Sequence, residues 1–518
     1  MATAGAGHCK PKVASWQLLL TSRQAHRHLR ASEKSIQQER KRRIPADVPP
    51  PSARRPLAKR AVTRKILGVS NQIVTASDRV NLRLTLNFLP RKPNRPTLDT
   101  VFCCISAIQP CLIGAAVHAT AVKIEPQEAI HELVGQHARE LSAKLQAHRL
   151  NLFPPSAKKT LRRFSSTEAA KLIGVTDAYL RRLSIEGKGP AVEVGQGGRR
   201  SYTIEDLNEL RRYLAQITKG DRNYLPHRGS NEHLQVITVV NFKGGSGKTT
   251  TAAHLAQYLA LRGYRVLALD LDPQASLSAL HGLQPEFDVG ENETLYGAIR
   301  YDGNRRDLSQ IIRPTYFTNL DLVPGNLELM EFEHESPRAL LSGEEDRQLF
   351  FTRMDAALAT VADHYDVVVV DCPPQLGFLT MSALCSATAV LVTAHPQMLD
   401  VMSMCQFLIM TSNLLGVVAN AGGNMNYDWM RYLITRYEPG DGPQNQMVSF
   451  MRSMFGEHVL NFPMLKSTAI SDAGITKQTL YEVSRDQFTR STYDRAIEAL
   501  DAVNGEVEQL IRSAWGRP

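Results

Sequence analysis

Residues 236–250 read VITVVNFKGGSGKTT, and this stretch decides the fold of the 518-residue chain. An apolar run of strand length leads into a glycine-rich loop, and apolar residues at helical spacing follow the loop. Strand, glycine loop and helix in this order are the setting of a phosphate-binding loop. We therefore expect phosphate groups to be held by Gly244, Gly245, Ser246, Gly247, Lys248, Thr249 and Thr250.

The residue types in the loop support this interpretation. Glycines let backbone N–H groups converge on phosphate oxygens, and the start of the helix adds a favourable dipole. Lys248 is expected to pair with the β and γ phosphates, and Thr249 to ligate Mg²⁺. Phe242 stands where the general motif has its first glycine, and a second lysine, Lys243, precedes the glycine pair.

Two further apolar runs end in aspartates. Residues 266–269 are followed by Asp270 and Asp272, and the valines of 366–371 are followed by Asp371. Carboxylates at the C-terminal ends of strands lie where ligands bind in open α/β sheets. We expect Asp371 to hold the magnesium shell through water, and Asp270 to be a structural partner.

Further strands are expected at 389–392 and 432–434, which gives at least five strands alternating with helices. Such alternation predicts an α/β fold with a mostly parallel sheet that is wound on both faces. Residues 236–518 are therefore expected to form one P-loop domain. A polar linker, 219–235, joins it to a smaller helical domain over 161–218.

The smaller domain begins with the start and stop signals of two short helices. Ser165 and Glu168 form a capping box, Gly174 ends the first helix, and a second helix is expected over 177–183. Two short helices joined by a tight glycine turn are typical of a helix-turn-helix. The glycines and alternation of 192–202 suggest a two-stranded wing.

This order of elements resembles the MerR-like winged helix of bacterial regulators. In that motif the second helix enters the major groove and the wing touches phosphates. The expected DNA-binding residues are Tyr179, Arg181, Arg182, Arg199 and Arg200. The alternative is a purely structural domain in which these arginines form a solvated face.

The net charge of +10 is confined to one end of the chain. Residues 1–120 hold 21 lysines and arginines against 5 acidic residues, whereas 121–518 hold 40 against 46. The basic segment shows little hydrophobic period, so we expect it to be disordered. We favour a mis-assigned start, with Val117 or Val122 as the true first residue, over a basic nucleic-acid arm or a transit peptide.

A helical pattern begins at Glu128, within the segment 121–160. One face carries apolar residues, which either pack on the next domain or form a dimer: Ile130, Leu133, Val134, Ala138, Leu141 and Leu145.

The seven cysteines form no CxxC pair, which argues against a zinc site. We take 100–122 as the only long uncharged apolar run, and Pro110 interrupts it. The expectation is a reduced, cytoplasmic protein without a membrane span.

The string KGGSGKTT at 243–250 resembles the deviant Walker loop of the ParA/MinD/nitrogenase-iron-protein class. The resemblance implies ATP and Mg²⁺ as cofactors, and a sandwich homodimer in which Lys243 reaches the partner's nucleotide. Asp272 lies 24 residues after Lys248 and matches the family aspartate that positions the attacking water. The implied activity is ATP hydrolysis, with Lys243, Lys248 and Asp272 as catalytic residues.

Within this class, the partition branch fits best. Cys372, Cys385 and Cys405 do not reproduce the cysteine arrangement of an iron–sulfur member. The segment 493–518 holds three arginines against five acidic residues, unlike the basic membrane helix of MinD-type members. Three stretches, 396–408, 444–450 and 463–482, resemble the RepA partition proteins of repABC-type plasmids, and the resemblance covers 121–518.

That resemblance implies a plasmid-partition ATPase associated with the nucleoid. Its ATP-bound dimer would bind nonspecific DNA, a ParB- or RepB-type centromere-binding partner would stimulate hydrolysis, and the small domain would bind operator DNA to repress the operon. Pro463 would lie near the adenine, and Lys466 would contact nonspecific DNA. The rival hypothesis is a transcriptional repressor that senses ATP or ADP, with incidental hydrolysis.

Overall fold

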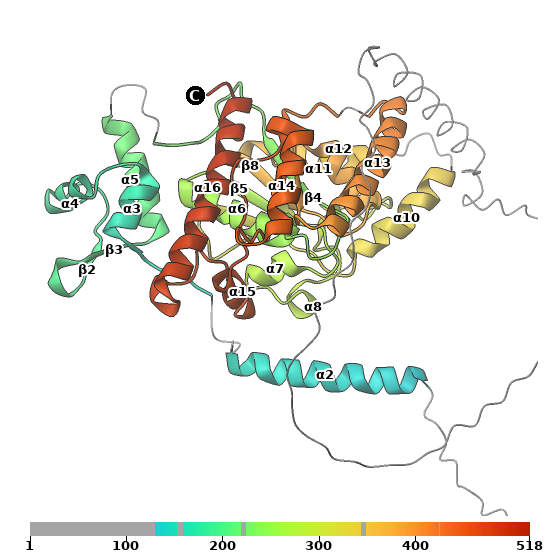
Figure 1. Cartoon of the computed structure of the whole chain (residues 1–518), viewed down its shortest axis with the longest axis horizontal. Coiled ribbons are helices and arrows are strands. Elements are labelled where there is room, and N and C mark those ends of the chain that lie inside the picture. Colours follow the sequence, from blue (N-terminus) through green and yellow to red (C-terminus); the bar gives the residue numbers. More distant parts are fainter. Residues whose placement is uncertain (1–129, 153–158, 219–223, 343–348, 424, 518) are drawn as a thin grey trace, which may run out of the picture. The chain divides into compact units, whose positions relative to one another are not determined.

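The computed structural model describes residues 130–152, 159–218, 224–342, 349–423 and 425–517 (Figure 1). The expectations about residues 1–120, including an internal start at Val117 or Val122, lie outside the described residues. The same holds for 121–129 and for part of the linker, 219–223.

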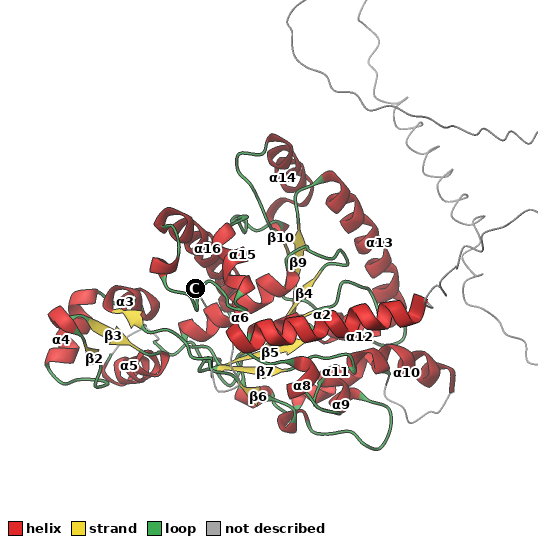
Figure 2. Ribbon diagram, turned by 90° about the horizontal axis from the view of Figure 1, so that it is seen from below, coloured by secondary structure: helices red, strands yellow, loops and turns green. Residues whose placement is uncertain are grey.

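The large domain is built on a seven-stranded sheet in the order β10-β9-β4-β8-β5-β7-β6 (Figure 2). All neighbours pair in parallel except β6, which is antiparallel to β7. The strands are β4 (Gln235–Val240), β5 (Val266–Asp270), β6 (Arg313–Pro314), β7 (Leu320–Val323), β8 (Val367–Asp371), β9 (Ala389–Ala394) and β10 (Trp429–Ile434). The mostly parallel sheet and its five predicted strands are confirmed, while β6 and β7 were missed because both are short.

Alternate residues of each strand face two separate cores. Ile237 and Val239 of β4 belong to one core, and Val236 and Val240 belong to the other. The first core includes α6 (Lys248–Arg262), α7 (Ser276–Leu280), α15 (Thr468–Ile475) and α16 (Arg490–Ala514). The second includes α9 (Leu295–Ile299), α10 (Leu329–Ser342), α11 (Phe350–Ala359), α12 (Phe378–Ser386), α13 (Met398–Asn420) and α14 (Gly442–Phe455). The sheet is therefore wound on both faces, as predicted.

The shorter elements of the large domain are single helical turns between these layers. They are α8 (Pro285–Asp288) and the 3₁₀ turns η4 (Leu308–Gln310), η5 (Ala362–His364), η6 (Gly456–His458) and η7 (Arg485–Gln487).

The small domain has three helices and a three-stranded antiparallel sheet in the order β1-β3-β2. Its elements are β1 (Phe164–Ser165), α3 (Ser166–Ile173), α4 (Asp177–Ile185), β2 (Glu193–Val194), η3 (Gln196–Gly198), β3 (Arg200–Tyr202) and α5 (Ile204–Ile217). The capping box of Ser165 and Glu168 is present, and Gly174 ends α3 in the left-handed conformation with φ of 82°. These local signals therefore set the helix boundaries as the sequence predicts.

Arg211 of α5 joins the small domain to the large one. Its side chain is buried, and its guanidinium donates to the carbonyl of Leu172 in α3, at 3.2 Å, and to that of Leu261 in α6. Both carbonyls lie in the last turn of a helix, where the helix dipole favours a positive charge. Leu207 and Leu214 of α5 belong to the same core as α6.

The N-terminal helix α2 (Ile130–Leu152) is present where the sequence predicts a helix. Ile130, Val134 and Leu141 on its apolar face are exposed. The choice between packing on the next domain and forming a dimer therefore remains a prediction.

Helix α13 overturns one expectation from the sequence. Residues 401–427 contain no Asp, Glu, Lys or Arg, so 100–122 is not the only long uncharged run. By length and composition, α13 could cross a bilayer, with a mean hydropathy of 1.7. Met404 and Phe407 of this helix pack in the second core, so α13 is a layer of the fold, and composition alone is weak support for a membrane span.

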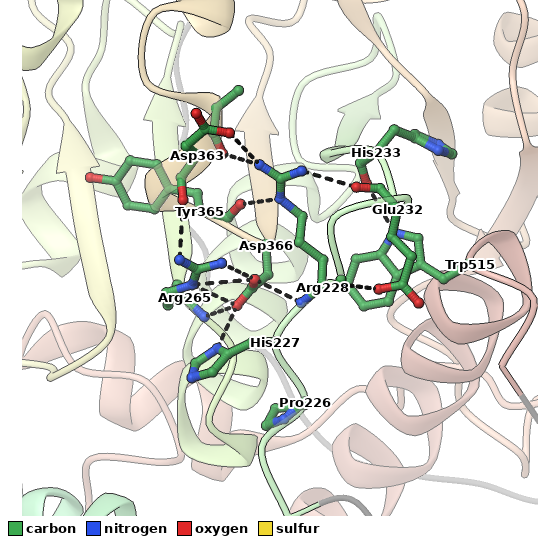
Figure 3. A network of polar contacts seen from close by, with 12 residues as sticks. Pro226, His227, Arg228, Glu232, His233, Arg265, Asp363, Tyr365, Asp366 and Trp515 are labelled. Carbon is green, nitrogen blue, oxygen red and sulfur yellow. Dashed lines mark hydrogen bonds and ion pairs between the residues drawn. The ribbon is translucent and has the colours of Figure 1, made fainter.

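A polar network around Asp366, at the start of β8, binds His227 and Arg228 of the segment that leads into β4 (Figure 3). The carboxylate of Asp366 is fully buried and accepts hydrogen bonds from Arg265 Nη2 at 2.6 Å, from His227 Nδ1 at 2.9 Å, and from the backbone N–H of Arg228 at 3.0 Å. Burial alone would raise the pKa of Asp366, but the hydrogen bonds from His227 and Arg265 hold it well below its usual range. The network therefore stabilises the fold only while Asp366 is ionised.

Asp366→Asn is expected to lower the melting temperature of the full chain by about 9 °C at pH 7. Removing one partner of a buried ion pair costs roughly 3 kcal/mol, and 1 kcal/mol shifts the melting temperature of a large domain by about 3 °C. Because the folded pKa is lowered, this stability is present above the ordinary pKa of 3.8 and is lost as the pH falls through the folded pKa. Calorimetry should show the gap to wild type narrowing below about pH 5.

Asp363→Asn is the matched control, because the fully exposed carboxylate of Asp363 pairs with Arg228 at 3.5 Å at the edge of the same network. Its melting temperature should equal that of wild type. Equal melting temperatures for Asp366→Asn and wild type at pH 7 would contradict the stabilising role of Asp366.

Candidate nucleotide-binding site

The glycine loop between β4 and α6 is shaped by two glycines and held by the neighbouring strands. Gly245 and Gly247 have φ of 76° and 88°, in the left-handed region where glycine costs least. The hydroxyl of Thr435, beyond β10, donates to the carbonyl of Ser246 at 2.7 Å, and Thr393 of β9 donates to the Ser246 hydroxyl at 3.0 Å. The loop is therefore fixed before any ligand arrives.

A cavity of about 710 Å³ opens in front of this loop, which is a size typical of ligand pockets. The predicted residues that line it are Gly244, Gly245, Gly247, Lys248, Thr249, Thr250 and Asp272. Ser246 is buried beneath the loop. Most of the rest of the lining comes from α7, from the segment after β10, and from α15, with Gln274, Pro374 and Lys477 beside them.

Lys248 lines the cavity, and Asp371 is a second buried group, of opposite charge, that acts on Lys248 from outside the lining. Lys248 is 7% exposed, and Asp371, at the end of β8, is fully buried. Among the described residues, neither carboxylate oxygen of Asp371 accepts a hydrogen bond. Burial lowers the pKa of Lys248, while the carboxylate of Asp371 opposes that shift. Lys248 Nζ donates a hydrogen bond to the carbonyl of Lys243 at 3.4 Å, and the carboxyl of Asp371 has no such partner in the described part of the chain, so a phosphate and a cation would supply the contacts that these two buried groups lack.

Asp270 lies beside Asp371 because β5 and β8 pair in register at these two residues. Its carboxylate accepts hydrogen bonds from the backbone and the hydroxyl of Ser278, at 2.8 and 2.7 Å, and burial raises its pKa to about 7. Burial, and then the neighbouring Asp270, raises the pKa of Asp371 as well. Asp270 is a structural partner in these contacts, as predicted.

The residues at this position fit a magnesium ion. Mg²⁺ prefers oxygen ligands and keeps much of its water shell. Thr249 supplies a hydroxyl that lines the cavity, and the orphaned carboxylate of Asp371 lies behind it. The Thr249 hydroxyl and the Lys248 ammonium favour the ionised form of Asp371.

Asp272 lies in the wall of the cavity, between β5 and α7. Its side chain is half-buried, and its Oδ1 accepts a hydrogen bond from the backbone N–H of Gln274 at 2.9 Å. This placement is compatible with the role implied by the family resemblance.

Lys243 points away from the cavity of its own chain. Its Nζ forms an ion pair with Asp400 of α13 at 2.7 Å, and the lysine side chain is 38% exposed. Lys243 is not among the residues that line the cavity. The sequence did not indicate Asp400, because it lies 157 positions further along the chain.

Two weaker expectations fall at the far end of the cavity. Pro463 is not a lining residue, although Met464, the next residue, is. Lys466 does line the cavity and forms an ion pair with Glu438 at 2.8 Å. Arg436 was missed: its Nη1 donates to the carbonyl of Gly245 at 3.1 Å. Its place just beyond a predicted strand end was the signal that could have found it.

The predicted DNA-binding residues lie on α4 and the β2–β3 hairpin. Tyr179 is half-buried under Arg182, whose guanidinium lies 5.0 Å from the ring centroid. Arg181 pairs with Asp177 of its own helix at 2.7 Å. Arg200 donates to the Ser184 hydroxyl at 2.9 Å, which ties the hairpin to α4. Arg181, Arg182 and Arg199 are exposed.

Comparison with known proteins gives matches to the large domain and to most of the chain. Residues 234–417 match a family described as an AAA domain. A protein of Rhizobium rhizogenes named "Putative replication protein A" is 63% identical over 386 residues, which cover 74% of this chain and 96% of that protein. Protein SopA of Escherichia coli is 30% identical over 388 residues, covering 73% of this chain and 95% of SopA. A solved structure described as a partition protein is 19% identical with a TM-score of 0.48, covering 74% of this chain and 99% of that one.

Proposed function

The chain belongs to the ParA-type family of partition ATPases, and on that premise we propose that it binds and hydrolyses ATP to switch its affinity for DNA. The observation that carries this proposal is the orphaned, buried carboxylate of Asp371 beside Lys248 and the glycine loop. A structural role alone would leave that carboxylate uncompensated, at a considerable cost in free energy.

Each residue of the site then has a task. The backbone N–H groups of the loop and Lys248 bind the phosphates. Thr249 and Asp371 would hold Mg²⁺, which would supply positive charge to the phosphate oxygens. Asp272 orients a water molecule for attack on the terminal phosphate.

Dimerisation is proposed to follow ATP binding and to recruit Lys243. In one chain the ammonium of Lys243 is held by Asp400, outside its own cavity. In the dimer, Lys243 of each chain would leave Asp400 and contact the nucleotide of the other chain. This exchange would complete both nucleotide sites. The ion pair with Asp400 is then a resting position that competes with the dimer.

Asp400→Asn is expected to strengthen ATP-dependent dimerisation about fivefold. A half-exposed ion pair is worth at most about 1 kcal/mol, which corresponds to roughly a fivefold change in an equilibrium constant. Sedimentation of the full chain with a non-hydrolysable ATP analogue measures this change. Glu438→Gln removes a more exposed ion pair, at Lys466, and should leave dimerisation unchanged. Weaker dimerisation in Asp400→Asn would show that Asp400 instead holds Lys243 ready for the partner.

The small domain is proposed to be a winged helix-turn-helix that binds operator DNA. Supporting this, α3 and α4 are short helices joined by a glycine turn, and the β2–β3 hairpin follows them. Exposed Arg181, Arg182 and Arg199 lie on α4 and this hairpin. Binding by such residues should weaken steeply as salt rises, because each phosphate contact releases counterions.

The biological role that we propose is plasmid partition in the cytoplasm, with autorepression through the small domain. A ParB-type partner would accelerate hydrolysis, and the ATP-bound dimer would hold nonspecific DNA. The test is ATP turnover by the full chain at fixed salt, with and without random DNA and a co-encoded ParB-type protein. Turnover that rises only with both additions supports this role. Turnover that neither random DNA nor the ParB-type protein changes favours the rival hypothesis, a repressor that senses ATP or ADP.

A further inference from the structure

The segment that leads into the small domain contacts the large domain through two basic side chains: Arg162 donates to the carbonyl of Tyr481 at 3.1 Å, and the largely buried Lys159 makes more contacts. The side chain of Lys159 is 14% exposed, and its Nζ contacts four oxygen atoms. Two are backbone carbonyls, of Leu280 at 2.6 Å and of Lys477 at 2.7 Å. The others are the hydroxyl of Tyr316 at 2.8 Å and the carboxylate of Glu482 at 2.7 Å.

The two carbonyls belong to separate pieces of the nucleotide cavity. Leu280 is the last residue of α7, the helix that follows Asp272, and Lys477 lies just beyond α15. Both residues line the cavity, whereas Lys159 does not. The ammonium group therefore ties two parts of the cavity wall together from outside.

These parts of the wall lie beyond the phosphate-binding loop. Because the loop and Lys248 take the phosphates, the sugar and base must extend along the remaining lining. A large share of it comes from α7 and from the region of α15, through Ser276, Ala279, Leu280, Ile470, Ser471, Gly474 and Lys477. The distance between α7 and the end of α15 thus helps to set the width of the space for the nucleoside.

We infer that Lys159 is a positioning residue for the nucleoside end of the bound nucleotide. Its ammonium fixes the spacing of the Leu280 and Lys477 carbonyls, and Glu482, whose side chain is 1% exposed, supplies the counter-charge. A buried ammonium is tolerated only when it is paired and hydrogen-bonded, and all four contacts meet this requirement. The inference rests on the proposed ATP site and adds to it a residue outside the P-loop domain.

The test compares variants of the full chain by calorimetric titration with ATP and with ADP in Mg²⁺. The main variant joins Lys159→Met to Glu482→Gln, so that no buried carboxylate is left without its partner. ATP and ADP should both bind about tenfold more weakly, by the same factor, because the base and sugar are common to both. Glu482→Gln alone removes the counter-charge but keeps the carbonyl contacts of Lys159, so it should weaken binding of both nucleotides by a smaller factor than the double variant does.

Lys171→Met tests whether the loss of any contact between the two domains weakens nucleotide binding. Lys171 also joins the small domain to α16, through an exposed ion pair with Asp501 at 2.7 Å. This variant should leave both affinities unchanged. Three results would overturn the inference: unchanged affinities in the double variant, a loss for ATP much larger than for ADP, or an equal loss in Lys171→Met. Failure of wild type to bind ATP would instead overturn the proposed function. Lys159→Arg, which retains the charge and several donors, should recover part of the affinity if the double variant folds poorly.

Discussion

Lys248→Met is expected to weaken ATP binding by the full chain at least about 100-fold. The ammonium of Lys248 is almost fully buried beside Asp371 and faces the space where the phosphates lie. The pair that is lost on binding is the one between this ammonium and a phosphate, and truncating one partner of a buried charge pair across a binding interface costs roughly 3 kcal/mol. Each 1.4 kcal/mol is a tenfold change in affinity. Titration calorimetry with ATP and Mg²⁺ measures the effect.

The same substitution should not destabilise the protein without ligand. Burial lowers the pKa of Lys248, so the folded state binds its proton less tightly than the unfolded state does. A lysine of this kind costs stability below its ordinary pKa of 10.5; the cost grows as the pH falls to the folded pKa and is constant below it. Lys248→Met should therefore melt at or above the wild-type temperature, which separates lost binding from lost folding.

Lys243→Met is the matched control in the same loop. Lys243 is half-exposed and directed at Asp400, so its loss should leave ATP binding by the single chain within a few-fold of wild type. Dimerisation with ATP should fail in this variant. Equal loss of ATP binding in both variants would contradict the separate roles given to the two lysines.

Asp272→Asn is expected to lower ATP turnover at least about 100-fold while leaving ATP affinity nearly unchanged. Asparagine retains the shape of the side chain and can still accept the hydrogen bond from Gln274. It cannot draw a proton from water, and positioned acid–base groups contribute roughly 100-fold or more to rates. The variant should stay bound to random DNA after ATP is added. Single-turnover kinetics and DNA retention measure the two effects.

Asp270→Asn tests whether the loss of turnover is specific to Asp272 or common to both aspartates. Asp270 is buried, accepts two hydrogen bonds from Ser278 and does not line the cavity. Its substitution should mainly lower the melting temperature, with a smaller loss of turnover than Asp272→Asn causes. Normal hydrolysis by Asp272→Asn would show that its assignment as the water-positioning residue is wrong.

The sequence by itself determined the parts of the molecule that depend on neighbours along the chain. The loop at 243–250, the buried strands that end in Asp270 and Asp371, and the caps of α3 were all predicted in place. Each rests on a local cause: glycine in a left-handed turn, an apolar run of strand length, or a side chain that caps its own helix. Because parallel strands align their carboxyl ends, the gathering of these residues at one edge also followed from sequence.

Only the tertiary structure decided which distant partners complete the site. Asp400 holds Lys243, Thr435 supports the loop, and Lys159 reaches two walls of the cavity, although each lies far along the chain from what it contacts. Met402, Ile409 and Val417 of α13 are exposed, and the sequence did not indicate this, since composition does not reveal which face of a helix is covered. Such contacts depend on strand order and on how helices dock against the sheet, and no periodicity along the chain encodes them.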